Sequence, residues 1–375
     1  MRRFPLILLL IALCVILSGC AFRPEVENQA YVLVLGIERG EDGQLELTAK
    51  IPKIGKSTDG KAEGGAASPY QTFTAQGSTW SNALENLQWV TPRELNLSHV
   101  KLLVVSDALA SEVRFSDMIR DISETPHLYT TAHFAVCDGD VSAFVEAQQP
   151  VIGTRLSSDI DAAMRHYAAH GYIPESLLAE IYCASGSFYS DPVAARCSMD
   201  GDEAAKPASL VVAPDTAFSD APKEVPQRFG GCAVFSHGAL ALNLGIRETQ
   251  LLSLALGNSD ALELDRDGVP CALRLEGRPK LKVEIQYGAV TVHLDMRFSC
   301  LNSLDRFDAQ AASEQLANEY EALIQRCQAA GVEPFGFATV AARRFLTNAD
   351  WIEFDWPARF AQARADVSIS ILPGI

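Results

Sequence analysis

The stretch KLKVEIQYGAVTVHLDMRF, residues 280–298, indicates the fold class most directly. Residues 280–286 and 290–298 alternate apolar and polar side chains, which is the period of a half-buried strand, and Tyr287-Gly288 between them marks a turn. Shortly afterwards, apolar residues three or four apart predict an amphipathic helix from Asp308 to Ala330. Strands followed by a packed helix are typical of an α+β domain.

Similar patterns extend in both directions along the chain. Apolar or alternating runs predict strands at residues 31–37, 44–50, 100–106, 130–137, 230–235 and 367–372, with four strand-like runs in residues 261–299. Apolar residues on one face predict helices at residues 115–123, 141–147, 157–169, 175–182 and 247–256. Ser78 is expected to cap one more helix, whose apolar face includes Ala83 and Leu87.

Neither the strand pattern nor the helix pattern continues through the segment between the first and the second group of predicted elements. Residues 196–228 are polar and rich in Ala and Pro, which is typical of a linker or a long surface loop. We therefore predict an α+β fold in two blocks of mixed or antiparallel sheet with packed helices. The first block covers residues 20–195 and is long enough to contain two subdomains, and the second covers residues 229–375.

The first twenty residues carry a lipoprotein signal. Arg2 and Arg3 precede an almost wholly apolar run from Phe4 to Leu17, which ends at Leu17-Ser-Gly-Cys20. About fourteen helical residues reach only ~21 Å, short of a ~30 Å hydrocarbon core, so a secretory signal is favoured over a spanning helix. Small residues before a cysteine predict that the Cys20 thiol receives a diacylglyceryl group and that residues 1–19 are removed. A plain signal peptide with an unrelated cysteine is the alternative.

Composition and charge narrow the classes of function. The chain has 375 residues, 48% of them apolar, which fits a globular protein of about two domains. Lys and Arg total 31 against 47 Asp and Glu, a net charge of −16, and no local basic patch offsets it. Such an acidic surface repels polyphosphate, so nucleic-acid binding is disfavoured.

Seven cysteines remain in the expected mature chain besides Cys20, and none forms a C-x-x-C motif. An odd number at low density favours buried thiols that act as small apolar side chains over a disulfide framework. Cys183 and Cys197, which flank a loop, are the pair to test for a bridge.

Short catalytic motifs for serine hydrolases, dinucleotide binding, P-loops and zinc proteases are absent from the sequence. His166 and His170 have a spacing that can bind zinc, but no third ligand is apparent, so a polar helix face is the favoured interpretation. His99, at the start of an apolar strand, is interpreted as a structural histidine rather than a general base. Trp351 and Trp356 are interpreted as core anchors rather than a ligand-stacking site. No catalytic residue, metal or cofactor is predicted.

Several short motifs occur in one order along the chain. They are residues 30–48 with Gly36, 77–87, 93–101 with His99, 107–110, 231–235, 248–254, 334–337 with Gly336 and Phe337, and the pair Trp351 and Trp356 before the closing strand. Together they resemble the Ger(x)C family, the C-subunit lipoproteins of spore germinant receptors. The chain departs from the family pattern at Ala21-Phe22, where Trp-Asp is common, and at Pro334 after Glu333.

The resemblance implies a lipid-anchored subunit on the outer surface of the spore inner membrane. It implies two multi-pass partners, the A and B subunits, which complete a receptor for small nutrients, with the B subunit the better candidate for the nutrient pocket. The expected role is a scaffold or signalling element without catalysis. The motif residues Gly36, His99, Gly336, Phe337, Trp351 and Trp356 are then interpreted as structural.

Two other classes of function stay open at this point. A solute-binding lipoprotein that feeds a permease needs two α/β lobes around a cleft, which the irregular strand and helix order disfavours. An extracytoplasmic hydrolase needs a metal at His166 and His170, which metal analysis of the purified protein would detect.

Overall fold

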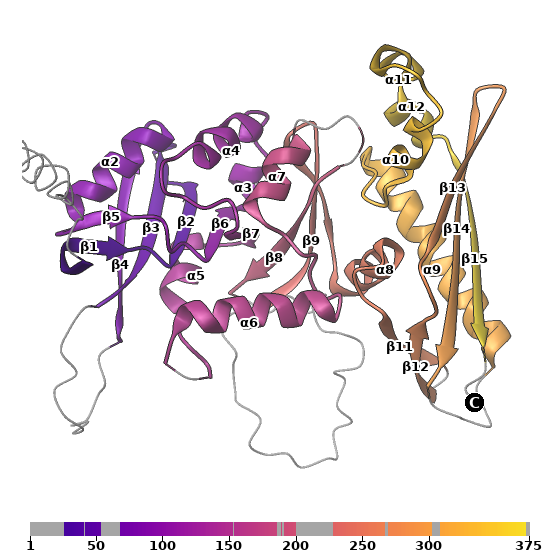
Figure 1. Cartoon of the computed structure of the whole chain (residues 1–375), viewed down its shortest axis with the longest axis horizontal. Helices are drawn as coiled ribbons and strands as arrows, with labels where there is room; N and C mark the ends of the chain where they lie inside the picture. Colours follow the sequence, from indigo (N-terminus) through magenta and orange to yellow (C-terminus); the bar gives the residue numbers. More distant parts are fainter. Residues whose placement is uncertain are drawn as a thin grey trace, which may run out of the picture.

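The computed structural model describes residues 26–40, 42–53, 68–152, 154–185, 189, 191–199, 228–266, 269–301 and 308–372. Within these residues the chain forms two large sheets that lie side by side, with one helix between them (Figure 1). The predicted signal peptide, Cys20 and most of the predicted linker lie outside the described residues. The predicted α+β class is confirmed.

The first sheet has eight strands. Their spatial order is β4 (Tyr70–Gly77), β3 (Leu45–Pro52), β2 (Val34–Arg39), β6 (Leu102–Ser106), β7 (His133–Asp138), β8 (Val193–Ser198), β9 (Arg228–Ser236) and β10 (Ala239–Leu244). The four central strands from β2 to β8 run parallel, and the two strands at each edge pair in antiparallel fashion. A turn, η1 (Val26–Asn28), leads into a separate parallel pair of β1 (Gln29–Tyr31) and β5 (Glu94–Asn96).

Helices cover both faces of this sheet. One face carries α2 (Trp80–Val90), α3 (Asp107–Ala110), α4 (Phe115–Ser123) and α7 (Leu178–Ser185). The other face carries α5 (Val141–Ala147) and α6 (Leu156–Ala169). Burial on both faces explains why the parallel strand β6 is an unbroken apolar run rather than an alternating one.

Gly36 allows α5 to lie close to the sheet. It is part of β2, and a Cβ atom at this position would lie 2.6 Å from a methyl carbon of Val141 and 2.8 Å from one of Val145. Both valines are fully buried. The glycine is therefore required by a close approach of backbone and helix rather than by a turn.

The second sheet has five strands, β11 (Ala261–Arg266), β12 (Val269–Leu275), β14 (Ala289–Cys300), β13 (Lys280–Gln286) and β15 (Arg364–Leu372), of which β15 runs parallel to β14. The long helix α9 (Ala309–Ala330) packs against one face of this sheet (Figure 1). Three short helices follow it, α10 (Phe337–Ala342), α11 (Asn348–Phe354) and α12 (Trp356–Phe360). The helix α8 (Ile246–Leu256) lies between the two sheets (Figure 1).

The predicted bounds of several helices agree with the structure. The helices α4 and α5 have the predicted ends, and α9 begins after Asp308, whose side chain accepts a hydrogen bond from the N–H of Ala311. Two details were wrong. Thr79, not Ser78, caps α2. The helix predicted at 175–182 begins only at residue 178, because the backbone carbonyl of Ser176 accepts a hydrogen bond from the N–H of Phe134 in β7, and the Ser176 hydroxyl group donates to the Phe134 carbonyl.

The predicted boundary between the blocks differs from the structure. Residues 196–198, assigned to the linker, are the end of β8, and the strand predicted to open the second block is β9 of the first sheet. The strand β9 contributes buried side chains to the cores of both halves of the chain. Ala233 and Phe235 belong to the core under α4 and α7, whereas Cys232 and Val234 belong to the core of the second sheet. The second sheet itself begins at β11.

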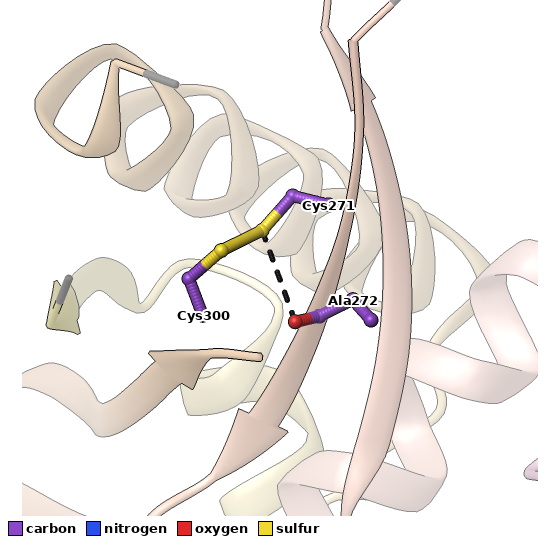
Figure 2. The surroundings of a disulfide bond; sticks show 3 residues. All are labelled: Cys271, Ala272 and Cys300. Carbon is purple, nitrogen blue, oxygen red and sulfur yellow. Dashed lines mark hydrogen bonds between the residues drawn. A yellow bond between two sulfur atoms is a disulfide. The ribbon is translucent and has the colours of Figure 1, made fainter. Parts of the chain in front are cut away.

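The described residues contain one disulfide, and it is not the pair that the sequence indicated. Cys271 in β12 and Cys300 at the end of β14 are bridged, with Cα atoms 6.5 Å apart (Figure 2). Cys183 and Cys197 are free thiols, the first exposed and the second buried. Cys197 lies in register with Cys137 on the neighbouring strand, so the β8 backbone turns it away from α7.

We predict that Gly36→Ala destabilises the chain by ~1–3 kcal/mol, because the added methyl group forces α5 away from the sheet. Urea unfolding followed by circular dichroism measures the loss. Gly40→Ala is the matched control, since the Cβ there meets only side-chain ends, the amide group of Gln76 at 2.8 Å and a carboxylate oxygen of Asp42 at 3.4 Å. Equal stability of the two variants would contradict the close approach at Gly36.

A second prediction concerns the disulfide. The bridge closes a loop with a sequence separation of 29, so the variant with serine at both Cys271 and Cys300 should lose ~3–4 kcal/mol of unfolding free energy. Cys183→Ser should change stability by less than ~0.5 kcal/mol, because its thiol is exposed. Peptide mapping without reductant checks the connectivity, and a peptide joining Cys183 to Cys197 would refute it.

Candidate functional site

The turn before α10 is built around a buried carboxyl group. Glu333 is 5% exposed and accepts a hydrogen bond of 2.8 Å from the backbone N–H of Ala338. Its own N–H donates to the Asp191 carboxylate at 2.6 Å. Gly336 has a φ of 87° and begins α10, which explains why glycine occupies this position. The turn therefore ties the second block to the segment that precedes β8.

Burial controls the ionisation of both acids. The pKa of Glu333 is raised to about 8, chiefly by burial and also by the nearby charge of Asp191, against backbone hydrogen bonds that lower it. Burial likewise raises the pKa of Asp191. The Glu333 carboxyl group is thus protonated over a wider pH range than an exposed glutamate.

Next to this turn lies a cluster of aromatic rings. The fully buried Phe337 ring lies 5.7 Å from the Phe335 ring and 6.4 Å from that of Phe360. Trp351 and Trp356 are each 4% exposed and stack with their ring centroids 5.6 Å apart. The rings fill the core of the second block and leave no exposed indole face for a ligand.

The aromatic cluster also contacts the first block. The Tyr189 ring lies 5.9 Å from that of Trp351, and its hydroxyl group donates to Asn348 at 2.5 Å. The Thr339 hydroxyl group donates to the backbone carbonyl of Tyr189 at 3.1 Å. These contacts, with the Asp191 hydrogen bond, hold the residues before β8 against α10 and α11.

The predicted histidines lie in two parts of the fold, His99 between β5 and β6 and the other two at the end of α6. His99 is exposed between β5 and β6, where its ring meets the edge of Tyr31 at 4.6 Å and its Nδ1 lies 2.9 Å from the Ser98 hydroxyl group. His166 and His170 are exposed on and just after α6, with ring centroids 4.4 Å apart. In the part of the chain that the structure describes, no three His, Cys, Asp or Glu residues are arranged to hold a metal ion.

A polar cavity of about 410 Å³ lies between the two blocks, and we call it the seam cavity. Its lining residues are Asp138, Arg196, Cys197, Ser198, Gly230, Asn243, Gly245, Ile246, Arg247, Glu248 and Arg326. The sequence did not reveal this site, because Arg196 appeared to begin a linker and the others lie far apart along the chain. The paired glycines at 230 and 231 were the only local sign of unusual backbone there.

Ion pairs connect the elements around the seam cavity. Arg196 pairs with Asp138 at 3.2 Å, and Arg326 pairs with Glu248 and donates to the backbone carbonyl of Asn243 at 2.8 Å. Of the predicted site residues, Gly36, His99, Gly336, Phe337, Trp351 and Trp356 all lie outside the cavity lining. Cys20 lies outside the described residues.

We predict that Glu333→Gln removes part of the pH dependence of stability. The folded-state pKa lies above the ordinary 4.5, so the stabilisation from the protonated carboxyl group is fully present below pH 4.5 and is lost as the pH rises through about 8. Glutamine keeps an acceptor for Ala338 and carries no charge. The midpoint of thermal unfolding should therefore fall less for the variant than for the wild type between pH 4.5 and 8. Glu353→Gln, on the exposed side of α11, is the control and should follow the wild type.

Comparison with known proteins places these features in a family. The model of the spore germination protein N-terminal domain matches residues 23–199, and that of the spore germination B3/GerAC-like C-terminal domain matches residues 230–372. Spore germination protein KC of Bacillus subtilis (strain 168) is 26% identical over 137 residues, 36% of this chain and 34% of that protein. Putative spore germination protein YfkR of the same organism is 27% identical over 103 residues, 27% of each chain.

The matched stretches thus span only about a third or less of these two relatives. The superposition on the crystal structure of the GerBC protein covers 90% of this chain and 96% of the GerBC chain, with a TM-score of 0.54 and 12% sequence identity. This similarity shows a shared fold. Because the two domain models together match most of the sequence, in the order in which the structure builds its two blocks, the chain belongs to the Ger(x)C family of spore germination proteins.

Proposed function

We propose that the chain is the lipid-anchored C subunit of a nutrient germinant receptor and acts there as a scaffold without catalysis. The observation that carries the proposal is the match of both germination-protein domains along residues 23–372. Two multi-pass subunits, A and B, are its proposed partners. The location follows from the anchor, which would hold the chain on the outer surface of the spore inner membrane.

The burial of the family motifs supports a scaffold role. Gly336, Phe337, Trp351 and Trp356 build the core and turns of the second block, and Gly36 seats α5 on the first sheet. Residues of this kind maintain the shape of a surface rather than contact a substrate. A partner would then recognise surface residues that the motifs do not include.

An anchor at Cys20 would join the fold at the end where the described residues begin. The first described residues lead into β1, which lies beside β5 at the end of the first sheet remote from the second sheet (Figure 1). Among the described residues, no helix has the length and apolar character that crossing a membrane requires. A diacylglyceryl group on Cys20 would confine the chain to the membrane plane and raise its effective concentration near its partners.

The test is an affinity purification of the tagged chain from detergent-solubilised spore membranes, read by mass spectrometry. Recovery of two multi-pass proteins, one of them transporter-like, is expected. Recovery of an ATPase-linked permease instead would replace the proposal with a solute-binding lipoprotein, and recovery of no membrane protein would also overturn it.

Lipid anchoring gives a separate prediction. Cys20→Ala should leave the fold of the described residues intact, but it should release the protein from the membrane fraction and reduce the response to nutrients. Fractionation of spores and the loss of optical density during germination measure the two effects. Cys183→Ala, which removes an exposed thiol, should change neither. Full membrane retention of the Cys20 variant would rule out the anchor.

A further inference from the structure

The last turn of α2 presents apolar side chains on the side of the helix that faces away from the core. Trp89 is 81% exposed and Val90 is 49% exposed, and the exposed Pro92 follows in the turn that leads to β5. Trp89 lies about 200° around the helix axis from the buried Leu87, so it cannot join the apolar face that covers the first sheet. Tryptophan is highly buried on average, so this exposure is informative. We call Trp89, Val90 and Pro92 the α2 tip.

Hydrogen bonds hold the α2 tip in one conformation. The hydroxyl group and the N–H of Thr91 both donate to the carbonyl of Leu87, at 2.7 and 3.1 Å. The Gln88 side chain donates to the carbonyl of Arg93 at 2.9 Å and accepts from the N–H of Leu95 at 2.7 Å. These bonds join the end of α2 to β5. The exposed side chains therefore stand on a fixed backbone, which loses little conformational freedom on binding.

The expected lipid anchor lies close to the α2 tip. The strand β5 pairs with β1, with Glu94 opposite Gln29, and η1 precedes β1 directly. The chain from Cys20 to Val26 spans at most ~20 Å even when it is fully extended. A bilayer that holds the anchor therefore lies near β1, β5 and the end of α2, at the end of the first sheet remote from the second sheet (Figure 1).

The charges around the α2 tip disfavour an electrostatic attachment to lipid. Glu27, Glu85 and Glu94 are exposed, and Arg93 is half-buried. This local excess of negative charge repels anionic headgroups, as does the net charge of −16. Tryptophan combines an apolar ring with a polar N–H and is enriched where hydrocarbon meets water in membranes. An apolar contact with the interfacial region of a bilayer fits this surface better than a contact with charged headgroups.

We propose that the α2 tip is a second membrane contact, in which Trp89 and Val90 enter the interfacial region of the bilayer beside the lipid anchor. The inference rests on the proposed anchoring at Cys20 and goes beyond it, because a lipid tether alone lets the chain rotate above the membrane. Two contacts at one end hold the chain in one orientation, with the second sheet at the end farther from the bilayer (Figure 1). The second contact also strengthens the attachment, since apolar area buried in the interface adds to the anchor.

Tryptophan fluorescence tests this contact. The chain has four tryptophans, and Trp80, Trp351 and Trp356 are each 4% exposed, so a quencher from the surroundings reports mainly on Trp89. The full chain is purified in detergent and diluted onto preformed phosphatidylcholine vesicles. One set of vesicles contains phosphatidylcholine brominated near the headgroup end of its acyl chains, and aqueous acrylamide is added to a second set. Trp89→Phe gives the emission of the three buried tryptophans for subtraction.

Quenching of the Trp89 emission by the brominated lipid, together with protection from acrylamide, is expected. A vesicle-bound chain whose Trp89 is open to acrylamide and insensitive to the brominated lipid would overturn the contact and leave the anchor in place. Quenching that requires added phosphatidylglycerol would overturn it in favour of an electrostatic contact. A chain that does not float with the vesicles would overturn it as well, and the mass of the N-terminal peptide shows separately whether Cys20 carries the lipid.

Two variants and a control measure what the contact contributes to attachment. Trp89→Ser should transfer from donor to acceptor vesicles about tenfold faster than the wild type, because the bilayer no longer buries a large apolar ring. Trp89→Phe keeps an aromatic ring and should transfer within about threefold of the wild-type rate. Leu346→Ser, at a side chain that is 98% exposed on the second block, should transfer as the wild type does. Equal rates for Trp89→Ser and Leu346→Ser would contradict the proposal.

Discussion

A single strand, β9, belongs to one sheet and to two hydrophobic cores, and the arrangement of the whole chain depends on it. Its period of two directs Ala233 and Phe235 toward the helices of the first sheet and Cys232 and Val234 toward the second. A slip of one residue would exchange the two sets, so burial on both faces specifies the register of β9 strongly. The two sheets cannot shift relative to one another without disturbing this strand.

Polar contacts reinforce the same junction on two sides of β9. On one side the Asp191 carboxylate accepts a hydrogen bond from the backbone of Glu333, and Tyr189 packs on Trp351. Beside the seam cavity, Arg326 of α9 donates to the backbone carbonyl of Asn243 in β10 of the first sheet at 2.8 Å. The apolar strand fixes the register, and these directional contacts fix the angle between the blocks.

Local patterns predicted the elements well and their partners poorly. The helices α4, α5 and α9 could be predicted because their apolar stripes and caps lie within one short segment. The partner of β9 is β8, which lies across residues 200–227, and nothing local indicates that pairing. The predicted cysteine pair was wrong for the same reason, because Cys271 and Cys300 are brought together only by the pairing of β12 with β14. The seam cavity combines both difficulties, because its residues come from six elements.

The motif residues and the cavity residues therefore occupy different kinds of position in the fold. Gly36 satisfies a close approach of backbone and helix, Gly336 satisfies a positive φ, and the two tryptophans fill a core. Such constraints are local, so these residues are recognisable in sequence. The seam cavity takes Asp138 and Arg196 from the first sheet and Arg326 from the helix of the second block. Residues that meet only where the two blocks join leave no local pattern, so their proximity becomes visible only once the pairing of β8 with β9 is known.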